Sequence, residues 1–184
     1  MTLTPSQNYA RAKLVGKFPK TRKFAESFPF ELDQFQIDAC HAIESGNGVL
    51  VAAPTGAGKT IVGEFAVDLV ISSSGKCFYT TPIKALSNQK FAELTEKYGE
   101  SKVGLLTGDT SINSEAQIVV MTTEILRNMI YANSTTIDEL KYVVMDEVHY
   151  LADKFRGAVW EEILIHLSEA VQIISLSATV SNAE

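Results

Sequence analysis

Short apolar runs alternate along the chain with longer segments in which apolar residues recur every three or four positions. The runs predict strands, and the periodic segments predict amphipathic helices. The predicted strands cover residues 48–53, 76–81, 102–107, 117–121, 142–146 and 171–177. The predicted helices cover residues 33–45, 59–72, 83–98 and 123–131, and a last helix has an apolar face of Val159, Trp160, Ile163, Leu164 and Leu167.

Strands that are apolar on both faces and alternate with helices are typical of a buried parallel sheet. The predicted fold is therefore α/β, with a predominantly parallel sheet covered by helices on both faces. The runs Gly48–Ala53 and Tyr142–Asp146 are predicted to be buried strands. Pro19 and Pro29 lie among polar and basic residues and predict an irregular lead-in. The connection Gly108–Ala116 is too short for a crossover helix, so the strand order there stays open.

The segment Ala53–Thr60 has the spacing of a phosphate-binding P-loop, with alanine in place of the first glycine. Such a loop points its backbone N–H groups inward, which requires glycine where a Cβ would collide. Lys59 is predicted to contact the β- and γ-phosphates of ATP, and Thr60 to place its hydroxyl on Mg²⁺. The predicted nucleotide-binding residues of the loop are Ala53, Pro54, Thr55, Gly56, Ala57, Gly58, Lys59 and Thr60.

Two acids end the apolar strand that precedes Val148. Carboxylates at the C-terminal edge of a parallel strand project into the crevice where ligands of α/β sheets bind. Asp146 and Glu147 are therefore predicted, with Thr60, to form the Mg²⁺ site. Glu147 is predicted to orient and deprotonate the attacking water. We expect Lys59 and this acid pair, the predicted catalytic residues, to meet at one edge of a single sheet.

Composition and charge narrow the possible partners. No apolar run is long enough to span a membrane, and the N-terminus lacks the apolar core of a signal peptide. Cys40 and Cys77 have no metal-ligand spacing, so we expect buried thiols in a reducing compartment, the cytoplasm. Residues 1–24 hold six basic side chains and no acid, whereas residues 25–184 have a net charge of −12. The basic segment either contacts phosphates or is an unstructured linker, and the acidic remainder predicts a narrow nucleic-acid track.

With these residues in place, the sequence resembles the superfamily 2 DEVH-box RNA helicases of the superkiller-type, exosome-associated family, in its bacterial, actinobacterial-type branch. The resemblance runs from Phe28 to Thr179 and includes Asp146-Glu147-Val148-His149. It implies a RecA-like P-loop NTPase domain. It also implies that Phe30 stacks on adenine and that Gln36 reads the edge of the base.

The resemblance further implies contacts with single-stranded RNA through its backbone. Thr81-Pro82 and Thr122-Thr123 each lie where a strand meets a helix N-terminus, whose free N–H groups can bind phosphate oxygens. The implied coupling residues are His149, Ser177 and Thr179. The implied nucleic-acid residues are Thr81, Pro82, Lys84, Gly108, Asp109, Thr122, Thr123 and Arg127.

The expected function is that of the first motor domain of an ATP-dependent RNA helicase of RNA processing or degradation. Residues 1–24 are expected to be a basic segment and residues 25–184 the RecA-like domain. The family's second RecA-like domain has no counterpart in these residues, so we expect nucleotide binding with negligible turnover. A DNA repair helicase and a non-catalytic, ATP-gated nucleic-acid-binding module are the alternatives. Lys59, Thr60, Asp146 and Glu147 speak against the module, because a scaffold has no need of a water-activating acid.

Overall fold

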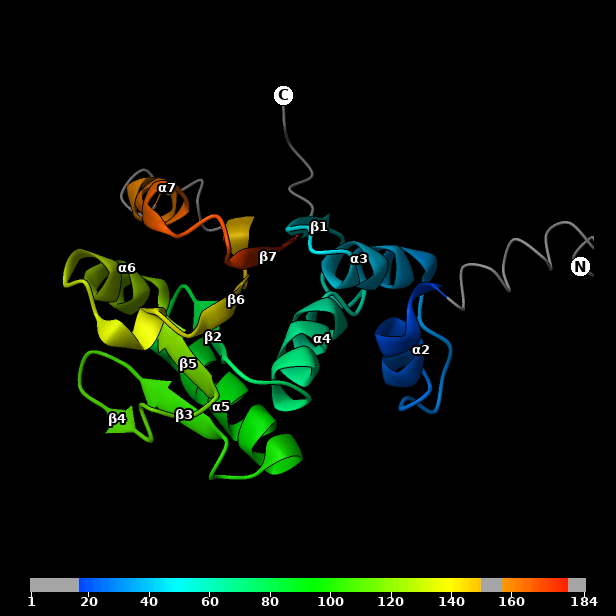
Figure 1. The fold of residues 1–184 in the computed structure, drawn as a ribbon, viewed down its shortest axis with the longest axis horizontal. Coiled ribbons are helices and arrows are strands. Elements are labelled where there is room, and N and C mark those ends of the chain that lie inside the picture. The colour runs from blue at the N-terminus through cyan, green and yellow to red at the C-terminus, as the bar shows by residue number, and fades with distance from the viewer. Residues whose placement is uncertain (1–16, 150–156, 179–184) are drawn as a thin grey trace, which may run out of the picture.

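The computed structural model describes residues 17–149 and 157–178. In these residues a seven-stranded sheet has the order β1-β7-β6-β2-β5-β3-β4 (Figure 1). All neighbouring strands are parallel except β3 and β4, which are antiparallel. The strands are β1 (Val49–Ala52), β2 (Lys76–Thr81), β3 (Val103–Leu106), β4 (Ser111–Ile112), β5 (Ile118–Thr122), β6 (Leu140–Met145) and β7 (Gln172–Ser177).

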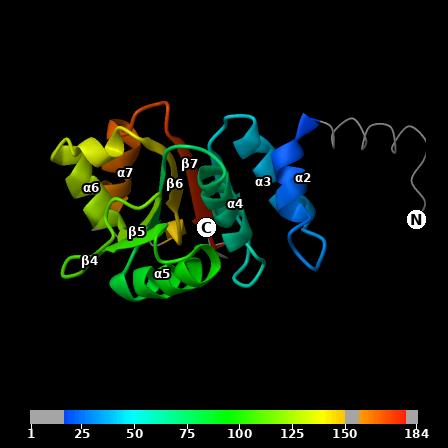
Figure 2. The same cartoon turned by 60° about the horizontal axis from the view of Figure 1, so that its bottom comes forward.

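Helices cover both faces of this sheet, which confirms the predicted fold class. One apolar core lies between the sheet and α4 and α5, with α2 and α3 packed behind α4. The second core lies between the opposite face and α6 and α7 (Figures 1 and 2). The helices are α2 (Pro19–Ala25), α3 (Gln34–Glu44), α4 (Thr60–Ile71), α5 (Lys84–Tyr98), α6 (Thr123–Tyr131) and α7 (Gly157–His166), with a 3-10 turn at Thr135–Ile137.

Successive residues of the central strand β2 face the two cores in turn. Cys77 and Tyr79 pack into the first core, and Phe78 packs into the second. All three side chains have no exposed surface, because β2 lies between β6 and β5 and beneath helices on both sides. The buried thiols predicted for Cys40 and Cys77 are found, and both cysteines are free.

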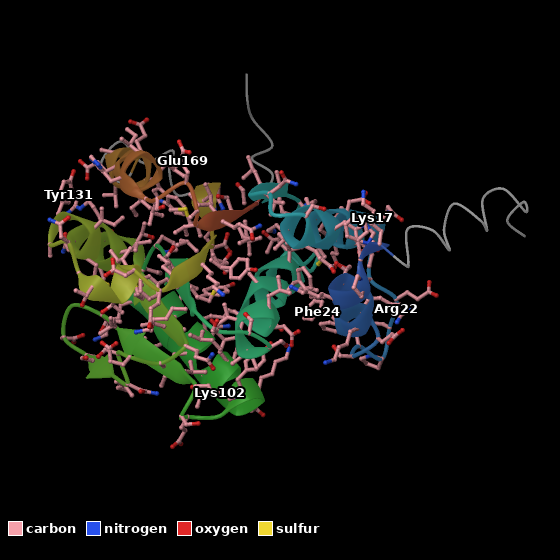
Figure 3. All side chains as sticks on the ribbon, viewed as in Figure 1. Lys17, Arg22, Phe24, Lys102, Tyr131 and Glu169 are labelled. Atoms are coloured by element: carbon pink, nitrogen blue, oxygen red, sulfur yellow. The ribbon has the colours of Figure 1, made fainter. Side chains whose placement is uncertain are left out.

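The prediction of an irregular lead-in is wrong for Pro19–Ala25, which forms α2. Phe18 and Phe24 are buried at the two ends of this helix. Glu44 accepts hydrogen bonds from the backbone N–H groups of Lys20 (3.0 Å) and Thr21 (2.7 Å), so a carboxylate from α3 caps the first turn. Three of the basic residues, Lys20, Arg22 and Lys23, lie in α2 with exposed side chains, and Figure 3 shows Arg22 pointing away from the body of the protein.

Two predicted burial patterns are also wrong. The apolar run Gly48–Ala53 was expected in the sheet interior, yet β1 is an edge strand and Leu50 is 68% exposed. Leu164 was expected on the inner face of its helix, but it is 52% exposed while Ile163 is fully buried. An apolar run of residues does not distinguish an edge strand from an interior strand. Whether the strand is buried depends on how many neighbouring strands it pairs with.

The open question of Gly108–Ala116 has a simple answer. The chain turns back after β3 and adds the short antiparallel strand β4, with Leu105 opposite Ile112. It then returns to β5, which pairs in parallel with β3 on its other side. No crossover helix is needed between β3 and β4, since antiparallel neighbours are joined by a tight turn.

Candidate nucleotide site and nucleic-acid interface

The predicted P-loop connects the edge strand β1 to α4, which begins at Thr60. Gly56 and Gly58 have φ of +85° and +76°, in the left-handed region that residues with a Cβ rarely adopt. A Cβ at Gly58 would also come within 2.6 Å of the Gln36 amide nitrogen. The two glycines therefore allow the loop to curl tightly between the strand and the helix.

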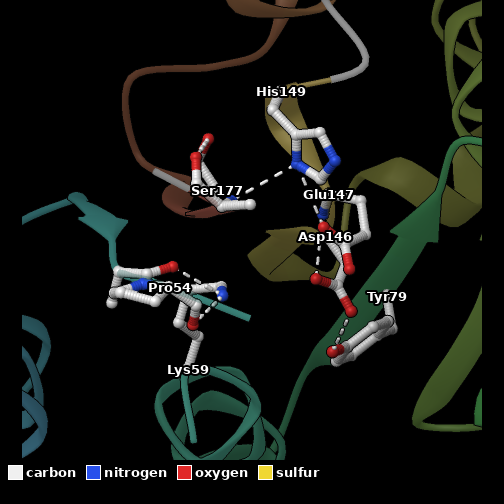
Figure 4. Close-up of polar contacts among 9 residues, drawn as sticks. Pro54, Lys59, Tyr79, Asp146, Glu147, His149 and Ser177 are labelled. Atoms are coloured by element: carbon white, nitrogen blue, oxygen red, sulfur yellow. Dashed lines mark hydrogen bonds and ion pairs between the residues drawn. The ribbon is translucent and has the colours of Figure 1, made fainter. Parts of the chain in front are cut away.

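Lys59 is held inside this curl. Its ammonium group donates hydrogen bonds to the backbone carbonyls of Ala53 (2.7 Å) and Pro54 (2.9 Å) (Figure 4). Ala57 N–H donates to the Pro54 carbonyl at 3.1 Å and closes the turn. The loop thus keeps its shape through contacts within the chain, with the positive charge at its centre.

The predicted adenine residues lie next to the loop. Gln36, at the start of α3, is buried and donates from its amide nitrogen to the Gly58 carbonyl at 2.9 Å. Its amide oxygen accepts from the Asp33 N–H at 2.8 Å. One amide proton and one lone pair therefore remain for a base edge. Phe30 is 54% exposed and packs against Phe28, with ring centroids 5.4 Å apart, so one face of its ring is available for stacking.

Asp146 and Glu147 follow the C-terminal end of β6. The order β1-β7-β6 leaves a single strand between them and the P-loop, so the two groups lie at the same edge of the sheet, about 10 Å apart at the strand ends. Asp146 accepts a hydrogen bond from the Tyr79 hydroxyl (2.9 Å) and another from the Glu147 N–H (2.9 Å) (Figure 4). Glu147 has a φ of +55°, which is rare for a residue with a side chain.

The predicted coupling residues bridge β6 and β7. The Nδ1 atom of His149 lies 3.1 Å from a Glu147 carboxylate oxygen and 3.3 Å from the Ala178 N–H, which follows Ser177 (Figure 4). An unprotonated Nδ1 accepts from the amide, and a protonated one donates to the carboxylate, so it serves one partner at a time. Thr179 lies outside the described residues.

The predicted nucleic-acid residues occupy the other half of the same edge. Thr81 at the end of β2 lies opposite Thr122 at the end of β5, which places the N-termini of α5 and α6 side by side. Pro82 is buried at this junction. The Thr81 hydroxyl lies 2.7 Å from that of Ser87, and the Thr123 hydroxyl donates to the Thr81 carbonyl at 3.2 Å. Both hydroxyls are therefore engaged within the protein, which leaves the N-termini of α5 and α6 as the predicted phosphate contacts.

The charged members of this half are paired within the protein. Lys84 forms an ion pair with Asp109, with a nitrogen–oxygen distance of 2.7 Å, and this pairing lowers the pKa of the Asp109 carboxyl. Gly108 has open space around its Cα, so a ligand can approach the backbone there. Arg127 lies 3.8 Å from Glu162 of α7. A phosphate would have to compete with a carboxylate for either cation.

Sequence reasoning missed Tyr79. Burial, and next the charge of Asp146, raise its pKa far above the usual range, so its hydroxyl keeps its proton. The signal was present, because a tyrosine in a fully buried strand needs a partner for its hydroxyl. Burial likewise raises the pKa of Cys40 to about 12, which leaves that thiol unreactive.

The donor set fits a magnesium-bound triphosphate. Gly56 has a left-handed φ, and a Cβ there would have nothing within 4 Å, so the curl opens toward free space. The ammonium of Lys59 suits phosphate oxygens, while a threonine hydroxyl and a carboxylate are the oxygen ligands that Mg²⁺ prefers. Thr60 and Asp146 would hold the ion.

This arrangement along one edge of a parallel sheet is that of a RecA-like P-loop domain. The sequence comparison identifies a particular family within this fold. The chain belongs to the DEAD/DEAH box helicase family, whose model matches residues 33–184.

Individual relatives confirm the superkiller-type, exosome-associated resemblance. The probable helicase HelY of Mycobacterium leprae is 62% identical over 162 residues, which are 88% of this chain and 18% of HelY. The human exosome RNA helicase MTR4 is 46% identical and covers 90% of this chain, in 16% of its own length. The Mycobacterium smegmatis helicase Lhr, solved with ssDNA and AMP-PNP, matches 90% of this chain and 25% of its own, with a TM-score of 0.70 and 32% identity. The chain thus spans less than a fifth of the curated relatives named here.

None of the helices in the described ranges has the length and apolar character that a bilayer crossing requires.

Proposed function

We propose that this chain is the nucleotide-binding motor domain of an ATP-dependent RNA helicase. The observation that carries the proposal is the meeting of the curled P-loop and the Asp146–Glu147 pair at one edge of the sheet, with only β7 between their strands. The strand ends beside them, at Thr81 and Thr122, then form the nucleic-acid half of the same edge.

Each residue near the nucleotide has a defined task in this proposal. Phe30 stacks on adenine, and Gln36 offers its remaining amide proton and lone pair to the base edge. Lys59 exchanges its two carbonyl partners for the β- and γ-phosphates. Asp146 and Thr60 orient the hydrated Mg²⁺, which neutralises phosphate charge. Glu147 holds the attacking water and takes its proton.

The nucleic-acid half binds one strand through its backbone. The N-termini of α5 and α6 point N–H groups at phosphate oxygens, and Lys84 and Arg127 add charge. Contacts of this kind do not depend on base sequence. RNA is favoured because MTR4, 46% identical to this chain, is an exosome RNA helicase. A second RecA-like domain and RNA-degradation machinery are the proposed protein partners.

DNA is the second candidate strand. The specific observation in its favour is Lhr, which is 32% identical to this chain and was solved with ssDNA. Both candidates predict the same nucleotide chemistry. They are therefore distinguished by whether RNA or DNA binds, and not by any property of the P-loop.

The nucleotide half is tested by titrating a fluorescent ATP analogue with the protein in the presence of Mg²⁺. Lys59→Ala is expected to weaken binding at least tenfold, about 1.4 kcal/mol, because a hydrogen-bonded charge is lost. Lys102→Ala, at the opposite edge of the sheet next to β3, is the matched control and should leave affinity unchanged (Figure 3). Equal affinity of the two variants would contradict the proposal.

A further inference from the structure

Tyr79 is a polar residue in the middle of the apolar strand β2. Its side chain has no exposed surface, and its hydroxyl donates to the Oδ2 atom of Asp146 at 2.9 Å (Figure 4). The direction of the bond is fixed, because a carboxylate oxygen accepts and the phenol donates. This hydrogen bond joins two neighbouring strands at the point where β6 reaches the edge of the sheet.

The Asp146 carboxylate is held from two sides. Its second oxygen, Oδ1, accepts from the Glu147 N–H at 2.9 Å. Its backbone N–H donates to the Thr80 carbonyl, also at 2.9 Å. A carboxylate bound through one oxygen can still rotate about its own axis, whereas bonds to both oxygens fix the plane. Tyr79 supplies the bond that the local backbone cannot.

The position of the hydroxyl is set by core packing. The ring of Tyr79 lies against α4, where a Cβ at Gly63 would come within 3.3 Å of it. The ammonium of Lys90 lies 5.5 Å from the ring centroid on the side of α5. A phenylalanine would fill the same space, so the hydroxyl is not needed for packing. Its contribution is the contact with Asp146.

We propose that Tyr79 is a positioning residue that orients the Asp146 carboxylate toward the hydrated Mg²⁺ of a bound nucleotide. The inference rests on the proposed function, since it assigns Asp146 to that ion. A hydrogen-bonding partner that fixes a metal-binding carboxylate strengthens the metal interaction without touching the metal. The nucleotide itself is not contacted by Tyr79, so its effect should appear only when Mg²⁺ is present.

The test uses Tyr79→Phe and the ratio of two dissociation constants for a fluorescent ATP analogue, measured with EDTA and with Mg²⁺. In the wild type, Mg²⁺ strengthens binding and the ratio is above one. Tyr79→Phe is expected to lower this ratio roughly tenfold, at the low end of what loss of such a partner costs. The constant measured with EDTA should stay within about twofold of the wild-type value, because the P-loop is unchanged.

Tyr98→Phe is the matched control, because it removes a buried hydroxyl that has no hydrogen-bond partner among the described residues, and it should leave the ratio unchanged. In an Asp146→Ala background, Tyr79→Phe should cause no further loss, since Tyr79 acts through Asp146.

Each outcome decides the question. An unchanged ratio in Tyr79→Phe would show that the hydroxyl does not position Asp146. Equal weakening with and without Mg²⁺, or loss of the cooperative thermal melt, would show a purely structural role. Any of these results would overturn the inference, while the proposed function stands. Absence of Mg²⁺-dependent nucleotide binding in the wild type would instead refute the proposed function, and the inference with it.

Discussion

Among the residues that the structure describes, three that are not glycine have a left-handed φ, and Glu147 is the one that is not an asparagine. Its φ of +55° places an ordinary side chain in the left-handed region, directly after a buried strand. Conformations of this kind cost about 1–3 kcal/mol and persist where the surroundings enforce them. Here the Asp146 carboxylate accepts a hydrogen bond from the Glu147 N–H at 2.9 Å, which helps to hold this conformation.

Replacing Glu147 by glycine should therefore stabilise the fold. Glu147→Gly is expected to raise the free energy of unfolding by roughly 0.5–1 kcal/mol in a urea titration, because glycine adopts this φ without strain. Ala92→Gly, at an exposed position in the interior of α5, is the control and should lower it by about 1 kcal/mol. A loss of stability in both variants would show that the backbone at Glu147 is not strained.

At this scale the place of the site residues at one edge of the sheet could be predicted, but their hydrogen-bond partners could not. Lys59 and the Asp146–Glu147 pair are indicated by loop spacing and by the end of an apolar run. The bond from Tyr79 to Asp146 spans 67 positions and depends on the register of β2 against β6. The bonds of Gln36 to Asp33 and Gly58 likewise depend on how α3 docks beside the loop.

Among the elements, α4 is the one that joins the P-loop to the sheet. Gly63 lies in its second turn, where a Cβ would approach a Val144 methyl to 2.9 Å and a Leu176 methyl to 3.2 Å. The missing side chain lets the helix lie close to β6 and β7. This close contact fixes the position of the P-loop relative to the end of β6, where Asp146 lies.

Gly63→Ala is expected to lower the free energy of unfolding by up to about 2 kcal/mol. Overpacking of a filled core costs about 1–3 kcal/mol, and the better helix propensity of alanine recovers about 1 kcal/mol of it. Gly108→Ala is the control, because it introduces a methyl group into open space. Chemical denaturation of both variants would measure the difference, and equal midpoints would contradict the close approach of α4.

Elements with a strong local pattern were predicted accurately. The strand 76–81 and the helix 123–131 have the bounds predicted from the alternation of apolar residues. The helix α2 was missed because it is short and rich in basic residues. It is stabilised by Glu44, whose carboxylate caps its first turn from a position more than twenty residues away in the sequence. The edge position of β1 was also missed, because the strand that pairs with β1 lies far along the chain and cannot be identified from the apolar run itself.

Across the whole molecule, charge is arranged so that the nucleic-acid half has few free cations. The chain has a net charge of −6, and Lys84 is already paired with Asp109. Backbone binding by helix N-termini releases few counterions. The proposed interface should therefore have a shallow salt dependence compared with a basic groove.

Lys84→Ala is expected to reduce the slope of log Kd against log salt concentration by about 0.7 for a single-stranded RNA oligonucleotide, since one phosphate contact is lost. Fluorescence anisotropy across a salt series measures it. Lys141→Ala, at an exposed position near the N-terminal end of β6 and away from the proposed interface, should leave the slope unchanged. The same series with single-stranded DNA of equal length tests the strand, because tighter binding of DNA would favour the second candidate. An unaltered slope in Lys84→Ala would remove Lys84 from the interface.

The central strand β2 belongs to both halves of the functional edge. It is paired residue by residue with β6, which leads into Asp146, and with β5, which leads into Thr123. The two proposed binding regions thus lie on adjacent strands of one hydrogen-bonded sheet, with no hinge or loop between them. Bending this part of the sheet would break ladder hydrogen bonds in a buried core. Under the proposed function, we therefore expect movement along the nucleic acid to come from displacement of this domain as a unit against another domain, and not from flexing of the sheet.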